Sequence, residues 1–113
     1  MRYCLALDLH DDPAVIAEYD RYHRAVWPEV LAHLRASGIQ DMTIWRRETR
    51  LFMLIEAEAG FVPEQLAIGP AAHPRVKEWE TLMARFQRPL PHAEKIAWQP
   101  LEQVFCLSEQ ISA

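Results

Sequence analysis

DMTIWRRETRLFMLIEAE, residues 41–58, is the stretch that decides the fold. It holds two strand-like segments, 41–46 and 51–58, joined by the polar residues 47–50, a connection of hairpin length. We therefore expect the two segments to pair as antiparallel strands. Residues 51–55 are apolar at five consecutive positions, which favours a strand that is buried on both of its faces.

The segments on either side extend this hairpin to a complete fold. A period of two among the apolar residues predicts a first strand near residues 3–9, and helical spacing predicts a first helix from about Pro13 to Arg35. Pro28 lies inside that helix and is expected to kink or restart it without changing its buried face. The apolar residues that predict a second helix and a final strand follow at Val76, Trp79, Met83 and Phe86, and at residues 101–107.

The resulting order, β-α-β-β-α-β, is that of a ferredoxin-like α+β fold with one antiparallel sheet and both helices on one face. The 113 residues suit a single domain, 1–113. Such a sheet leaves its other face open, although the strand at 51–55 is apolar on both sides. Two copies packed sheet to sheet would bury that face, so we expect a homodimer.

Composition and charge narrow the class of protein. Twelve Lys and Arg against 16 Asp and Glu leave a formal net charge of -4, which argues against nucleic acid as a partner. No apolar run approaches the roughly 20 residues that cross a bilayer, so no membrane partner is expected. The apolar segment after Arg2 is too short for a secretory signal, which favours the cytoplasm. Cys4 and Cys106 lie in apolar segments and are expected to be buried free thiols.

The best candidates for acid–base residues lie in the predicted first helix. Tyr19, His23 and Trp27 are spaced i, i+4, i+8 and would form a row on one face. A histidine in a partly dry pocket beside a phenol can exchange protons near neutral pH. A lone histidine on an apolar face is more often a core residue bonded to the backbone, so spacing alone leaves both roles open. Trp79 is core packing by periodicity, although aromatic rings also line sugar sites.

The other ionisable groups favour ordinary structural roles. Asp11 and Asp12 stand beside His10 where the first helix begins, so one of them is expected to cap that helix. The remaining histidines lack the spacing of metal ligands, and we expect no metal site.

The run from Tyr19 to Glu29, YDRYHRAVWPE, resembles the Y-x-x-x-H-x-x-x-W-P-E signature of the L-rhamnose mutarotase family. Gly38 falls where that family ends its first helix, and residues 101–107 resemble its C-terminal strand. The resemblance implies a dimeric α+β barrel enzyme that interconverts the α and β anomers of a 6-deoxy-L-sugar without metal or organic cofactor. It implies that His23 is the general acid and that Tyr19 contacts the monosaccharide substrate.

Two sugar contacts depart from the family pattern. A Trp-Trp pair on the second helix reads Glu78-Trp79 here, and a Tyr at the start of the second strand is replaced by Met42. We take Trp79, Met42 and Glu78 as substrate-binding positions. A carboxylate in place of a stacking ring could bind sugar hydroxyls, and the loss of a phenol removes one polar contact. The substrate is therefore expected to be L-rhamnose or L-fucose, which differ in the stereochemistry of ring hydroxyls.

Three functions from different classes remain open on the sequence alone. The first is a sugar mutarotase, an isomerase acting on carbohydrate. The second is a cofactorless monooxygenase of the dimeric α+β barrel type, which also uses histidines of the first helix. The third is a non-catalytic sugar-binding dimer that has lost activity through the changes at Met42 and Glu78.

Overall fold

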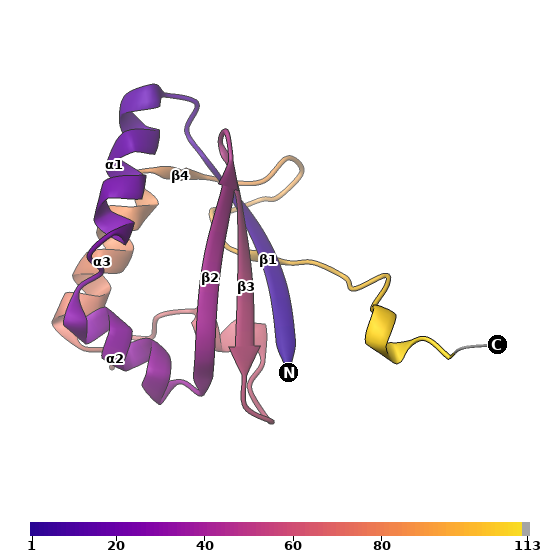
Figure 1. Cartoon of the computed structure of the whole chain (residues 1–113). Coiled ribbons are helices and arrows are strands. Elements are labelled where there is room, and N and C mark those ends of the chain that lie inside the picture. Colours follow the sequence, from indigo (N-terminus) through magenta and orange to yellow (C-terminus); the bar gives the residue numbers. More distant parts are fainter. Residues whose placement is uncertain (112–113) are drawn as a thin grey trace.

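Three long antiparallel strands form the centre of one sheet. In the computed structural model, which describes residues 1–111, β1 (Arg2–Leu9) pairs with β3 (Arg50–Ala57), and β3 pairs with the edge strand β2 (Ile39–Arg47) (Figure 1). Two very short strands, β4 (Gln87–Arg88) and β5 (Gln99–Pro100), pair with different parts of the free side of β1. The order is β2-β3-β1-β4, with every pairing antiparallel.

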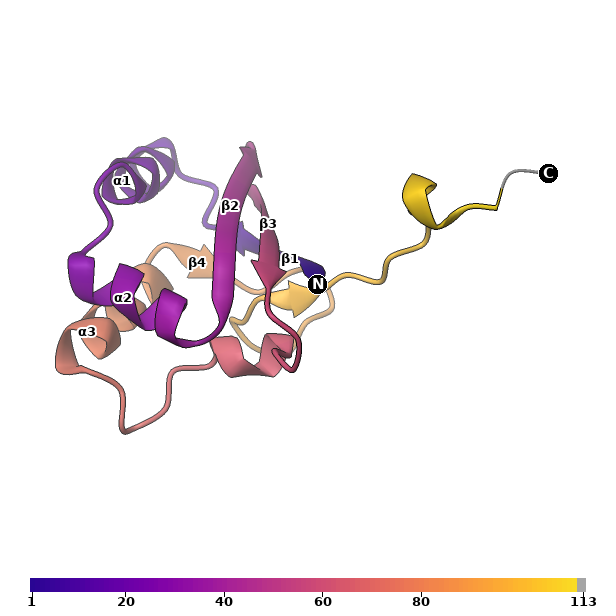
Figure 2. The same ribbon diagram turned by 60° about the horizontal axis from the view of Figure 1, so that its bottom comes forward.

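Three helices cover one face of this sheet. They are α1 (Pro13–His23), α2 (Pro28–Ala36) and α3 (Pro74–Ala84), and α2 and α3 lie side by side (Figure 2). Short 3-10 turns, η1 (Pro63–Leu66) and η2 (Leu107–Glu109), follow β3 and β5. The predicted ferredoxin-like α+β architecture, with an antiparallel sheet and its helices on one face, is confirmed.

The predicted first helix is two helices. Pro28 is the first residue of α2, where its missing N–H costs no hydrogen bond and its ring sets a helical φ. The predicted restart at Pro28 is therefore confirmed. Because α1 ends at His23, Trp27 lies at the N-cap of α2 and not on the same helix as Tyr19 and His23. Asp12 is the N-cap of α1, since its carboxylate accepts a hydrogen bond of 2.9 Å from the N–H of Ala14.

The hairpin from β2 to β3 has a tighter turn than its polar residues suggested. Only Glu48 and Thr49 lie between the strands, and Glu48 adopts the left-handed conformation with φ of 53°. Trp45 faces Phe52 across the two strands, on the face away from the helices. Their exposed fractions are 65% and 37%, so within one chain β3 is buried on a single face.

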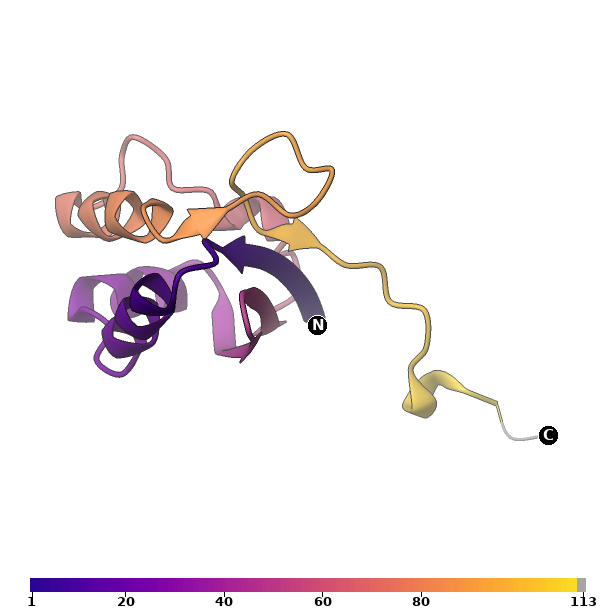
Figure 3. The same cartoon turned by 90° about the horizontal axis from the view of Figure 1, so that it is seen from above.

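The predicted final strand over 101–107 is wrong. Pro100 ends β5 and has no N–H to continue the ladder, and the last hydrogen bond to β1 runs from the N–H of Leu101 to the carbonyl of Cys4 at 2.8 Å. Residues 101–111, which we call the C-terminal arm, then leave the sheet on the side away from the helices (Figure 3). The arm carries exposed apolar side chains, namely Leu101, Val104, Phe105, Leu107 and Ile111.

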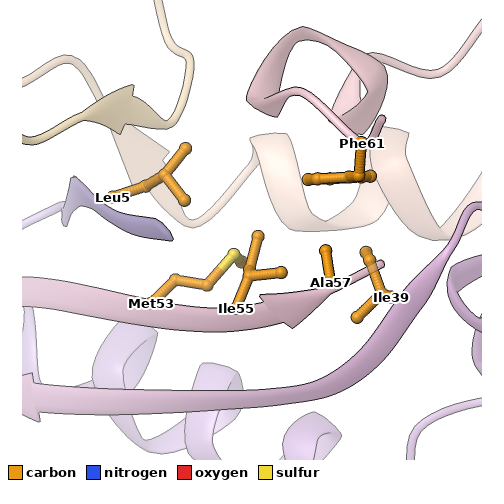
Figure 4. Close-up of a cluster of buried hydrophobic side chains, with 6 residues drawn as sticks. All are labelled: Leu5, Ile39, Met53, Ile55, Ala57 and Phe61. Carbon is orange, nitrogen blue, oxygen red and sulfur yellow. The ribbon is translucent and has the colours of Figure 1, made fainter. Parts of the chain in front are cut away.

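The core lies between the sheet and the segments that cover it. One cluster joins Leu5, Met53 and Ile55 of the central strands to Phe61, and Figure 4 shows these side chains pointing toward one another. A second cluster, centred on Tyr19 and Trp79, packs the helices against Leu9 and Leu51. The two clusters share partly buried neighbours and leave a cavity between them.

Both cysteines are free, as predicted, but neither is buried. Cys4 lies on the open face of the sheet and Cys106 on the C-terminal arm, so each keeps part of its surface in solvent. Across residues 1–111, no helix has the length and apolar character that crossing a membrane requires.

Candidate functional site

A cavity of about 410 Å³ separates the helices from the sheet, a volume in the range of small-ligand sites. Its wall has an apolar part from the core clusters and a set of polar side chains at its two ends. One end, formed by α1, α3 and β4, carries Tyr19, His23, Trp79, Glu80 and Gln87. The other, formed by the end of α2 and the start of β2, carries His33, Arg35, Gln40, Asp41 and Met42.

The ring of His23 is held in one orientation by its own helix. Its Nδ1 lies 2.8 Å from the carbonyl oxygen of Tyr19, one turn earlier. Because a carbonyl only accepts, Nδ1 carries a hydrogen and donates it. Nε2 is then the nitrogen whose protonation can change, on a ring that lines the cavity. The backbone contact that a core histidine would make thus orients a histidine that is also available to a ligand.

Burial shifts the pKa values of both His23 and Tyr19 on α1. Desolvation lowers the pKa of His23 below its usual 6.5, against smaller raising effects from the Tyr19 carbonyl and the charge of Asp20. Desolvation also raises the pKa of the Tyr19 phenol well above its usual range, and the charges of Asp20 and Glu80 act in the same direction. Tyr19 therefore stays protonated and acts as a hydrogen-bond donor.

Aromatic rings make the wall beside His23. The ring of Trp79 lies 5.5 Å from that of His23 and 5.1 Å from that of Trp27, both in edge-to-face geometry. The ring of Tyr19 lies 4.2 Å from that of His23, with the two ring planes tilted by 31°. The guanidinium of Arg75 lies 3.7 Å over the Trp27 ring, which braces this wall from outside.

The structure brings most of the predicted site residues together. Tyr19, His23, Trp79 and Met42 all line the cavity, although Trp27 is displaced from the row on α1 to the N-cap of α2. Glu78 does not line it. Its carboxylate forms an exposed ion pair of 2.6 Å with Arg75 on the outer side of α3.

Several polar residues of the cavity were not predicted from the sequence, among them Glu80 and Gln87 at the end that His23 lines. Glu80 follows Val76 by one helical turn and precedes Met83 by three residues, so the spacing of the second helix could have placed its carboxylate beside the buried face. Gln87, at the start of β4, is only 8% exposed and also lines the cavity. Gln87 had no sequence signal, because a two-residue strand has no periodicity.

Among residues 1–111, no group of three or more His, Cys, Asp or Glu side chains is placed to hold a metal ion. The groups at the α1–α3 end that can exchange protons are an imidazole and a carboxylate, beside a phenol that donates. This set can transfer protons to and from hydroxyl and ether oxygens.

Comparison with known proteins identifies the family. The sequence profile of the L-rhamnose mutarotase family matches residues 2–107. The chain belongs to the L-rhamnose mutarotase family. The prediction of a sugar mutarotase, an isomerase that acts on carbohydrate, is thereby confirmed, and the monooxygenase alternative loses its support.

Individual relatives cover nearly the whole chain. A protein named L-fucose mutarotase from Xanthomonas campestris pv. campestris is 45% identical over 98% of this chain and 91% of its own length. An L-rhamnose mutarotase from Acidiphilium cryptum is 33% identical over 91% of this chain and 96% of its own length. The crystal structure of an L-rhamnose mutarotase from Formosa agariphila superposes with a TM-score of 0.69 at 22% identity, covering 95% of this chain and 98% of that one. The last likeness supports the fold.

Proposed function

We propose that this family member interconverts the α and β anomers of a 6-deoxy-L-sugar, with L-fucose as its preferred substrate and L-rhamnose as the second. The observation that carries the proposal is the oriented His23, whose ring lines a sugar-sized cavity beside Tyr19 and Trp79. The preference for L-fucose rests on the 45% identity to the Xanthomonas protein named L-fucose mutarotase.

The reaction asks for two proton transfers. The imidazolium of His23 donates its Nε2 proton to the ring oxygen O5 while a second group removes the proton of the anomeric hydroxyl O1. The C1–O5 bond breaks, its electron pair goes to O5, and C1 and O1 become an aldehyde. Rotation about C1–C2 and the reverse transfers close the ring on the other face. Each positioned proton transfer contributes between about 100-fold and 10,000-fold in rate.

The lining of the cavity suits a 6-deoxy sugar. Trp79 offers a ring face or edge to the C–H side of a pyranose, and Tyr19 offers a hydroxyl that donates to sugar oxygens. Met42, Ile44 and Met53 form an apolar wall on the sheet side. A methyl group at C6 can lie against that wall without the desolvation cost of the hydroxyl that D-glucose carries there.

A homodimer is part of the same proposal. Trp45 and Phe52 stand exposed on the open face of the sheet, and the C-terminal arm presents exposed apolar side chains. The hydrogen bonds from the arm to β1 run from the N–H of Leu101 to the carbonyl of Cys4 and from the guanidinium of Arg2 to Sγ of Cys106. Packing of two sheets, with each arm lying against the partner, would bury both surfaces.

Analytical ultracentrifugation tests the dimer directly. The native chain should sediment at about twice its mass of 13.2 kDa, and removal of the residues from 104 onward or a Trp45→Arg substitution should shift it toward the monomer. A native chain that stays monomeric at micromolar concentration would contradict the dimer.

Saturation-transfer proton NMR tests the activity. Exchange between the α and β signals should be accelerated most for L-fucose, less for L-rhamnose and little for D-glucose. If the protein broadened the sugar signals by binding but did not accelerate anomer exchange, the non-catalytic sugar-binding alternative would be favoured instead.

A further inference from the structure

The reaction needs a proton acceptor opposite His23, and the cavity offers few groups for it. At the α1–α3 end, Tyr19 keeps its proton because burial raises its pKa, and the amide of Gln87 does not titrate. Asp41 lies at the other end of the cavity, where its carboxylate accepts the N–H of Met42 at 2.9 Å. Glu80 is the carboxylate that remains on the His23 side.

The position of Glu80 on α3 fixes its direction. Val76, Trp79 and Met83 are buried, and all three line the cavity together with Glu80, as residues at spacings of three, four and seven should on one helix face. The charge of Glu80 also raises the pKa of the Tyr19 phenol, and the ring of Tyr19 lies 4.2 Å from that of His23. The carboxylate therefore belongs to the end of the cavity that Tyr19 and His23 line.

The surroundings of Glu80 suit a group that gains and loses a proton. Desolvation by the protein raises the pKa of its carboxyl above the usual 4.5, and its charge is close enough to act on the Tyr19 phenol. The residue as a whole is exposed, because its stem lies at the surface of α3, and this gives the carboxyl a route for proton exchange with water. No ion pair of the described residues engages Glu80, in contrast to Glu78, which is held by Arg75.

We infer that Glu80 is the second acid–base residue of the site and exchanges a proton with the anomeric hydroxyl of the sugar. The inference rests on the proposed mutarotase activity. In ring opening the Glu80 carboxylate takes the O1 proton, the O1–H electron pair forms the C1=O1 bond, and His23 protonates O5. In ring closure both protons return, so no oxidant, reductant or further reactant is consumed.

This pairing has a definite pH dependence. The working form has Glu80 ionised and His23 protonated. With rising pH, kcat/KM should first rise as Glu80 loses its proton, with a midpoint above pH 4.5. It should then fall as His23 loses its proton, with a midpoint below pH 6.5. The titrating and charged groups near this end of the cavity are Tyr19, Asp20 and His23 from α1, Glu80 from α3, and Arg46 from β2, which forms an ion pair with Asp20.

Glu80→Gln is the direct test. An amide cannot accept the proton, so the anomer exchange rate at the pH optimum should fall by between about 100-fold and 10,000-fold, and the acid limb of the pH profile should disappear. Glu80→Asp keeps a carboxylate and should keep the acid limb at a reduced rate. Glu18→Gln on α1, an exposed carboxylate paired with Arg21, is the matched control and should change the rate by less than about twofold.

Several results would overturn the inference. They are an unchanged rate in Glu80→Gln, a reduced rate that keeps the acid limb, or loss of that limb in Glu78→Gln instead. A native protein that accelerates no anomer exchange would overturn the proposed function and the role of Glu80 with it. Far-UV circular dichroism of each variant separates a loss of chemistry from a loss of folding.

Discussion

Trp79 is both part of the core and part of the cavity wall, so we expect Trp79→Ala to lower the stability of the fold and to change the site. The side chain is 7% exposed, and its ring contacts those of Tyr22, His23 and Trp27 at 6.1, 5.5 and 5.1 Å. Replacement of a buried Trp by Ala costs about 3–5 kcal/mol in lost burial and a residual cavity. Aromatic pairs contribute about 0.5–1.5 kcal/mol each beyond their buried area, which places this site in the upper part of that range.

Urea unfolding followed by far-UV circular dichroism measures this loss. With a slope of about 2 kcal/mol/M, the midpoint of Trp79→Ala should fall by about 1.5–2.5 M. Trp79→Phe keeps one ring against His23 and should lose less. All variants are compared at one chain concentration, because a dimer makes the midpoint depend on it.

Two results would contradict this role of Trp79. If Trp79→Ala lost less than about 1 kcal/mol, the ring could not be the packing centre that its burial indicates. If Trp79→Ala lost stability while anomer exchange kept its full kcat and KM, the ring would be core packing without a role in the sugar site.

Other predictions concern single features. Gly38 and Gly60 have nearly the same positive φ, +93° and +92°, but a Cβ at Gly38 would lie 2.8 Å from Glu58 Oε1, whereas a Cβ at Gly60 would have no atom within 4 Å. Thermal unfolding should therefore show that Gly38→Ala is more destabilising than Gly60→Ala. Equal losses of stability would assign the cost to φ alone. Asp12→Ala should cost about 1 kcal/mol in urea unfolding through loss of the α1 cap, and Asp11→Ala should cost little. Because burial lowers the pKa of His23 in the folded protein, the unfolded chain binds more protons just below pH 6.5. As the pH falls, the free energy of unfolding should therefore decrease more steeply in the native protein than in His23→Asn. Identical slopes would contradict the lowered pKa.

The sequence predicted the central elements well because their signals are local. The turn between two strand-like runs, the restart at Pro28 and the spacing of Tyr19 and His23 on one helix each depend on neighbouring residues alone. The positions of α1, α2, β2 and β3 follow from these signals to within a few residues.

The errors concern features that depend on distant partners. Residues 101–107 have the apolar pattern of a strand, but Pro100 interrupts their pairing with β1 and they leave the sheet. The choice between Glu78 and Glu80 depends on which face of α3 packs toward α1, and this is set by the contacts of Trp79 rather than by either glutamate. The family pattern pointed to the position of Glu78, whereas helical spacing with Val76 and Met83 was the signal that could have pointed to Glu80.

The central claim is that His23 transfers protons to and from a sugar. Saturation transfer between the α and β proton signals of L-fucose, compared between the native protein and His23→Ala, tests it most directly. We expect clear acceleration by the native protein and a loss of at least about 100-fold in the variant, with its far-UV circular dichroism unchanged. A folded His23→Ala protein that loses less than about tenfold would contradict it.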